Sequence, residues 1–221
     1  LRCRRCVVVY PASPATAAGA ETSSQRGTEY LGKKADTLQP LYYDIGLNLF
    51  TRSFPDPEKI FADAAEAGIC CILTGSEARE NRLVSDFVKT HDAYGTAGIH
   101  PHAADEATLA DIDEIRQIIT RNDRVVAVGE TGLDYDHMYS KKENQQFYFS
   151  RLIELAEELH KPMFLHERDA ADDFIAAFKG HEDLCSRSVV HCYTGDKETL
   201  QRLLAMGFYI GITGWICDER R

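Results

Sequence analysis

Long apolar runs are absent from this sequence. No stretch of its 221 residues approaches the roughly 20 consecutive apolar residues that a membrane-spanning helix needs, so we expect a soluble protein with no membrane partner. Basic charge is also scarce, because 25 Lys and Arg residues stand against 35 Asp and Glu residues, a net charge of -10. A surface of this sign repels polyanions and argues against an extended nucleic-acid footprint, but it is compatible with a local phosphate site.

A regular cysteine framework is missing as well. The seven cysteines form an odd set without regular spacing, and Cys70 and Cys71 are adjacent inside an apolar run. This pattern is typical of reduced thiols and indicates an intracellular, cytoplasmic protein. Cys3 and Cys6 have the spacing of half a zinc or redox site, but no second half accompanies them. We therefore interpret them as ordinary cysteines of the N-terminal segment.

Residues 1–39 differ in composition from the rest of the chain. Arginines at positions 2, 4 and 5 precede a run of small and polar residues that offers little to pack. We interpret 1–39 as a disordered or targeting-like tail, which leaves organellar targeting open, and 40–221 as one globular domain. Nothing in that domain indicates an obligate protein partner.

From residue 42 onward, short apolar runs alternate with longer segments of helical spacing. The runs are YYDIGLNL, ICCILTGS, AYGTAGIH, VVAVGETG, PMFLHER, SVVHCYT and FYIGITG. Strict alternation predicts an α/β fold with parallel strands and right-handed crossovers. An open doubly wound sheet usually carries a Gly-rich phosphate loop after its first strand, and YYDIGLNLF has none. The sequence therefore favours a TIM (β/α)8-type barrel, incomplete, with about seven β/α units.

Residues able to bind a metal or a phosphate stand at the ends of most predicted strands. They are Asp44, Asn48, His100, His102, Glu130, His166, Arg168 and His191. Among them, Glu130, His166 and His191 occupy equivalent positions on three successive strands, where the C-terminal ends of a barrel converge. This placement predicts a metal site. The other histidines, at positions 91, 137, 160 and 181, fall on predicted helices or loops, and we interpret them as structural.

The chemistry of these three residues also favours a metal. A glutamate at the end of a buried strand costs desolvation energy unless a cation or another partner compensates it. Two imidazoles and one carboxylate suit Zn²⁺, Mn²⁺ or Fe²⁺, and can hold Mg²⁺ with help from water and substrate oxygens. Schiff-base chemistry would need a lysine at the C-terminal end of a strand, and Lys161 precedes its strand instead.

The motifs of residues 43–221 resemble those of the TatD family of metal-dependent deoxyribonucleases, which are amidohydrolase-like barrels. They read DIGLNL, TAGIHPH, VGETGLDYD, KPMFLHERDA, VVHCYTG and YIGITGWICDERR. The resemblance implies that Glu130, His166 and His191 bind metal, with Mg²⁺ the first expectation and Mn²⁺ or Zn²⁺ the alternatives. It implies that His100 and Arg168 face the substrate phosphate, and His102 and Asn48 join them as substrate-binding candidates. The implied reaction is phosphodiester hydrolysis from the 3′ end of single-stranded DNA, with RNA also open.

The sequence departs from the family's pattern in two places. Many relatives carry Asp-x-His-x-His on the first strand, where this chain has Asp44, Gly46 and Asn48. The family's eighth strand, with its aspartate, is not among these 221 residues, so the catalytic residue stays unassigned. We expect a fragment that is inactive or poorly soluble, with unpaired edges on the first and seventh strands. Glu167 replaces a frequent cysteine and should point away from the pocket.

Two other functions remain open at this point. The metal site alone does not select a substrate, so cleavage of another ester, such as that of a D-aminoacyl-tRNA, is one alternative. The second alternative is an inactive fragment that only binds.

Overall fold

The computed structural model of this chain describes residues 7–9 and 42–214. Most of the predicted tail, with Cys3 and Cys6, lies outside the described residues. The strands are β1 (Val7–Val9), β2 (Tyr42–Leu47), β3 (Ile69–Leu73), β4 (Tyr94–Ala97), β5 (Val125–Asp134), β6 (Met163–Arg168), β7 (Val189–Val190) and β8 (Tyr209–Ile212). The helices are α1 (Pro57–Glu66), α2 (Ala78–Thr90), the 3-10 turn η1 (Pro101–Ala103), α3 (Leu109–Arg121), α4 (Lys142–Glu158), α5 (Ala171–Ala177), α6 (Glu182–Cys185) and α7 (Lys197–Ala205).

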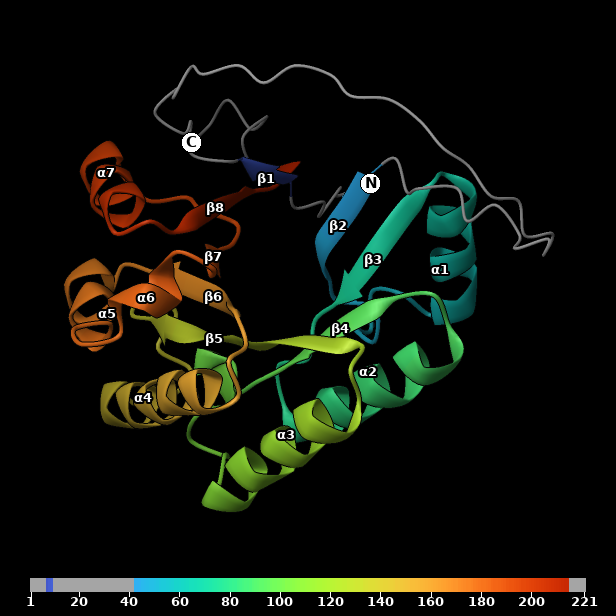
Figure 1. Ribbon diagram of the computed structural model, residues 1–221, viewed down its shortest axis with the longest axis horizontal. Helices are drawn as coiled ribbons and strands as arrows, with labels where there is room; N and C mark the ends of the chain where they lie inside the picture. The colour runs from blue at the N-terminus through green and yellow to red at the C-terminus, as the bar shows by residue number, and fades with distance from the viewer. Residues whose placement is uncertain (1–6, 10–41, 215–221) are drawn as a thin grey trace, which may run out of the picture.

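One curled sheet forms the centre of the molecule. Its strand order is β1-β8-β7-β6-β5-β4-β3-β2, and every neighbouring pair from β2 to β8 is parallel. The helices lie on the outer, convex side of the sheet (Figure 1). Seven parallel strands with helical crossovers confirm the predicted incomplete barrel, in which all strand C-termini meet on one side.

The outer edge of the seventh parallel strand is covered. β1 pairs antiparallel with β8, in the register Val8 opposite Gly211, and it approaches β2 across the opening of the sheet (Figure 1). The prediction of an unpaired edge on that strand is therefore wrong, because three residues of the N-terminal segment satisfy its backbone hydrogen bonds. The alternation of apolar runs and helical segments in residues 42–214 does not predict this antiparallel strand.

Local sequence signals start several of the helices. Asp56 precedes Pro57 at the start of α1, and its side chain accepts a hydrogen bond from the Lys59 backbone N–H at 3.0 Å. The side chain of Asp196 accepts in the same way from Thr199 at the start of α7, at 2.7 Å. Such caps satisfy backbone donors that have no partner within the first turn.

The core lies between the sheet and its outer helices. Helix α4 buries the side chains of Tyr148, Leu152 and Leu155 against the sheet side of the core. Next to them, four fully buried aromatic rings from α4, from α5 and its C-terminus, and from the residue before β8 pack on one another: Phe149, Phe174, Phe178 and Phe208. Each buried ring contributes about 1.5–3 kcal/mol. This packing fixes the helices that hold β5 and β6 in place. None of the described helices has both the length and the apolar character to cross a bilayer.

Candidate metal centre

Parallel strands bring the predicted metal ligands to one side of the sheet. Glu130 lies within β5, His166 lies within β6, and His191 directly follows β7. The backbone N–H of His191 donates to the Leu165 carbonyl at 2.9 Å, which continues the β6–β7 ladder by one residue. One ligand atom from each of Glu130, His166 and His191 lies within 4.8 Å of the others. The fold therefore brings together the three residues that the sequence predicts as metal ligands.

The carboxylate of Glu130 is surrounded by three imidazoles. Its Oε1 atom lies 2.6 Å from His191 Nε2, 3.2 Å from His100 Nε2 and 3.3 Å from His166 Nδ1. The glutamate is only 5% exposed, so water contributes little to its solvation. A buried carboxylate with several converging nitrogens is a donor set that fits a divalent ion.

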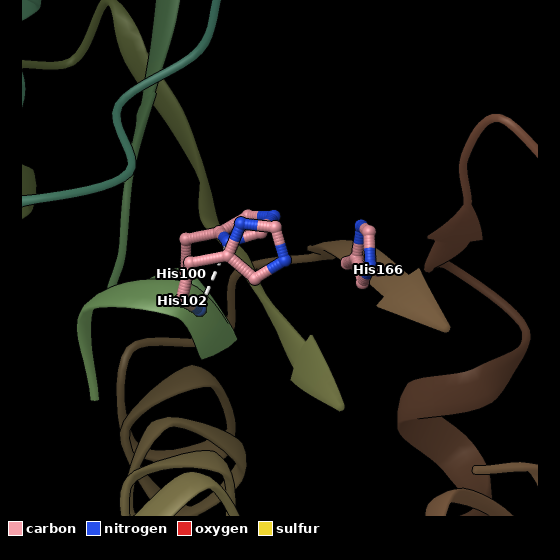
Figure 2. Close-up of side chains that lie close together, drawn as sticks. All are labelled: His100, His102 and His166. Carbon is pink, nitrogen blue, oxygen red and sulfur yellow. Dashed lines mark hydrogen bonds between the residues drawn. The ribbon is translucent and has the colours of Figure 1, made fainter. Parts of the chain in front are cut away.

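His100 has a defined tautomer in this cluster. Its Nδ1 accepts a hydrogen bond from the backbone N–H of His102 at 3.1 Å, so a neutral ring carries its proton on Nε2. Burial lowers the pKa of His100, which keeps the ring neutral at pH 7. The Nε2–H group therefore donates to Glu130. Figure 2 shows His100 and His102 side by side next to η1, with His166 facing them from β6.

A second carboxylate, Asp134, gathers three imidazoles as well. Its Oδ2 atom lies 2.7 Å from His102 Nε2, 2.8 Å from His137 Nδ1 and 3.1 Å from His166 Nε2. The residue is fully buried, and Oδ1 accepts from the backbone N–H groups of Asp136 and His137. His166 thus lies between the two carboxylates, with one ring nitrogen facing each.

This position explains the unusual protonation of His166. Burial opposes its positive charge, but the hydrogen bonds with Asp134 and Glu130 raise its pKa to about 9. Burial likewise opposes ionisation of Glu130, but the imidazoles of His191, His100 and His166 outweigh it and hold the pKa of that carboxyl well below its usual range. At neutral pH both groups are charged in the metal-free protein.

A family model described as TatD related DNase matches residues 43–221. The chain belongs to the TatD family. Its relatives include proteins named 3′-5′ ssDNA/RNA exonuclease TatD from Pantoea sp. (strain At-9b) and from Erwinia amylovora, each 40% identical over 183 residues. The alignments cover 81% of this chain and 70% of each relative.

Solved TatD structures share the fold. A TatD homologue from Escherichia coli K12 is 25% identical, with a TM-score of 0.69 over 78% of this chain and 68% of its own. A TatD family hydrolase from Entamoeba histolytica is 26% identical, with a TM-score of 0.66 over 76% of this chain and 64% of its own. The predicted family and the barrel architecture are both confirmed.

The predicted substrate-binding residues Arg168, Asn48 and His102 lie in different places in the fold. Arg168 donates to Thr194 Oγ1 at 2.7 Å and pairs with Asp136 at 3.2 Å, so it lies at the rim beside the Asp134 cluster. Asn48 is partly buried just beyond β2, and no hydrogen bond among the described residues joins it to the histidines. His102 contacts Asp134 directly.

Two residues of the Asp134 cluster were not predicted from the sequence. Asp134 received no role, and His137 was interpreted as structural. A usable signal existed for Asp134, since it lies four residues after Glu130 on the same strand and so on the same face. The sequence carried no such signal for His137, because a loop residue has no periodicity. His91 stacks on Phe87 and His181 pairs with Glu157, and neither belongs to a cluster.

Glu167 points away from the histidines, as predicted. Its carboxylate accepts the Ala170 backbone N–H at 2.9 Å and helps to line a cavity of about 590 Å³ beside α4, α5 and α7. None of the clustered histidines lines this cavity. The clustered histidines and this cavity are therefore different places in the molecule.

Proposed function

We propose that this chain is a metal-dependent phosphodiester hydrolase that removes nucleotides from the 3′ end of single-stranded DNA, and of RNA. The observation that carries the proposal is the buried Glu130 carboxylate with three imidazole nitrogens within 3.3 Å, gathered from neighbouring strands and loops of a TatD barrel. The names of the related exonucleases support the substrate class and the direction of attack.

Glu130, His166 and His191 are the proposed ligands of a divalent ion. The donor set fits Mn²⁺ or Zn²⁺ directly, and it fits Mg²⁺ when water and phosphate oxygens complete the coordination. Mg²⁺ is the ion that the family resemblance favours. When bound, such an ion stabilises charge on a phosphoryl oxygen and lowers the pKa of a water molecule.

Two further side chains would position the phosphate. His100 presents Nε2–H to the cluster, so it can donate to a phosphate oxygen, but the same proton prevents that atom from acting as a general base. Arg168 can bind a phosphate with two N–H groups if the phosphate displaces Asp136. These local charges allow an anionic substrate to bind a protein whose net charge is -10. A substrate role for Asn48 stays a prediction from the sequence.

The direct test uses a 5′-labelled single-stranded oligonucleotide, the purified chain and Mg²⁺ or Mn²⁺. In place of the inactivity expected from the sequence, we expect a ladder of products shortened one nucleotide at a time from the 3′ end, because Glu130, His166 and His191 come together within this chain. A phosphorothioate at the 3′-terminal linkage should block it, and excess EDTA should stop it. Absence of shortening with either ion, or cleavage that begins inside the strand, would contradict the proposal. A D-aminoacyl-tRNA offered under the same conditions separates nuclease from deacylase activity.

Metal affinity should rise with pH between 7 and 9. Since the His166 pKa is about 9, this ring is protonated at pH 7, and an ion must displace the proton before Nδ1 can ligate it. Each pH unit below that pKa costs about 1.4 kcal/mol, which is about tenfold in affinity. The dissociation constant for Mn²⁺ should therefore fall about tenfold per unit from pH 7 to 9 and then level off. Calorimetry at several pH values measures it, and a constant affinity over that range would contradict the His166 assignment.

A further inference from the structure

Asp134, His102 and His137 are a second group of side chains able to ligate a metal, and none of them is a proposed ligand of the Glu130 site. We propose that Asp134, His102 and His137 form a site for a second divalent ion of the Zn²⁺ class, next to the first. One ligand atom of each of these three residues lies within 4.8 Å of the others. The donors are two imidazole nitrogens and one carboxylate oxygen, a set typical of open zinc sites with three protein ligands.

Asp134 contacts more imidazoles than it needs in order to orient His166. A single carboxylate commonly accepts the outer N–H of one metal-binding histidine and fixes its ring. The His166 contact at 3.1 Å fulfils this role for the first site. Two more imidazoles approach the same oxygen from η1 and from the loop after β5, at 2.7 and 2.8 Å. Orientation of His166 does not account for these two contacts.

The distances are compatible with insertion of an ion. Bonds of about 2.0–2.1 Å in a tetrahedral arrangement place the donor atoms about 3.3 Å apart. The contacts of Asp134 with His102 and His137 would each lengthen by about half an ångström from their present 2.7 and 2.8 Å. Either neutral ring can carry its proton on the other nitrogen, which frees the facing nitrogen to ligate.

The position of the cluster gives an ion access from solvent on one side only. Asp134 is fully buried and is held by two backbone N–H groups, whereas the side chains of His102 and His137 are 34% and 46% exposed. The exposed ring of Tyr139 stacks on His137 and meets His102 edge-on, which restrains both imidazoles. The carboxylate is therefore preorganised, and the solvent side leaves room for water or a substrate oxygen to complete the coordination.

Metal stoichiometry tests the second site without relying on catalysis. Chelator-stripped protein is dialysed against Zn²⁺, and bound zinc is counted by elemental analysis. We expect two ions in the wild type, one in His137→Asn, one in Glu130→Gln and none in the double variant. His181→Asn removes an imidazole that pairs with the single carboxylate of Glu157, so this control should keep two ions.

A cysteine at the same position gives a positive signal. With Co²⁺, His137→Cys should show a cobalt–thiolate charge-transfer band that the wild type and His181→Asn lack, because a thiolate ligates such ions well. Circular dichroism checks that each variant is folded, which the exposure of His137 leads us to expect.

The outcomes separate this proposal from the proposed nuclease site. If His137→Asn binds one zinc ion fewer than the wild type and Glu130→Gln binds as many as the wild type, the Asp134 site is supported and the Glu130 site is overturned. Three results would each overturn the second site. The wild type could bind only one ion, which Glu130→Gln removes; His137→Asn could retain two ions; or folded His137→Cys could show no charge-transfer band.

Discussion

Replacing Glu130 by Gln is expected to weaken metal binding at the Glu130 site by at least about 100-fold and to remove nuclease activity with it. Loss of an outer partner of a metal ligand already costs about 10–100-fold in affinity, and Glu130 is proposed as a ligand itself. The amide removes the negative charge that three imidazoles approach within 3.3 Å. The fold should persist, with the metal-free protein destabilised by about 1–3 kcal/mol because hydrogen bonds to a buried carboxylate are lost.

Glu167→Gln is the matched control for this substitution. Glu167 is also buried and also lies within a strand, one residue after His166, but its carboxylate accepts the Ala170 backbone N–H instead of facing the histidines. We expect metal affinity and activity close to wild type. Calorimetric titration with Mn²⁺ and the oligonucleotide assay measure both variants. Equal affinities of Glu130→Gln and the wild type would rule out the ligand assignment of Glu130.

Gly132→Ala is expected to destabilise the protein by about 3–5 kcal/mol. Gly132 pairs with His166 between β5 and β6, and a methyl group there would lie 1.8 Å from the His166 carbonyl oxygen. The backbone φ of +147° adds strain of about 1–3 kcal/mol for any residue with a side chain. Relief of the clash has to separate β5 from β6, and this moves His166 away from both carboxylates. The variant should therefore lose metal affinity together with stability.

Gly180→Ala separates the effect of the clash from that of the backbone conformation. Gly180 has φ +88°, but an added methyl group would meet nothing within 4 Å. Its substitution should cost only about 1–2 kcal/mol and leave metal binding unchanged. Urea unfolding monitored by circular dichroism measures both variants. Similar losses in the two variants would contradict the role of Gly132 in the close β5–β6 contact.

Much of the fold and of the site could be predicted from the sequence. The alternation of apolar runs and helical segments specified the parallel strands, because each pattern has its own period and crossovers follow from the order. Glu130, His166 and His191 could be selected because they occupy equivalent positions of three successive parallel strands, which brings them to one side of the sheet. The predicted strand ends come too early for two of them, since β5 continues to Asp134 and β6 to Arg168. The motifs placed the chain in the TatD family, which the comparisons confirm.

The contacts made by loops and by the chain's N-terminal segment could not be predicted in this way. His137 follows β5 without a periodic pattern, and only the folded loop brings it within 2.8 Å of Asp134. The position of Arg168 was predictable, but its ion pair with Asp136 depends on how that same loop returns. Pairing of Val7–Val9 with β8 joins segments about two hundred residues apart.

Sequence periodicity determined which residues share a face, and therefore the barrel and the three residues of the Glu130 site. Tertiary structure alone decided that a second carboxylate shares His166 with the first and gathers His102 and His137 around it. The physical reason is that strand and helix periods are local properties of the chain. Which loop side chains meet above the strand ends depends on packing between segments that are far apart in the sequence.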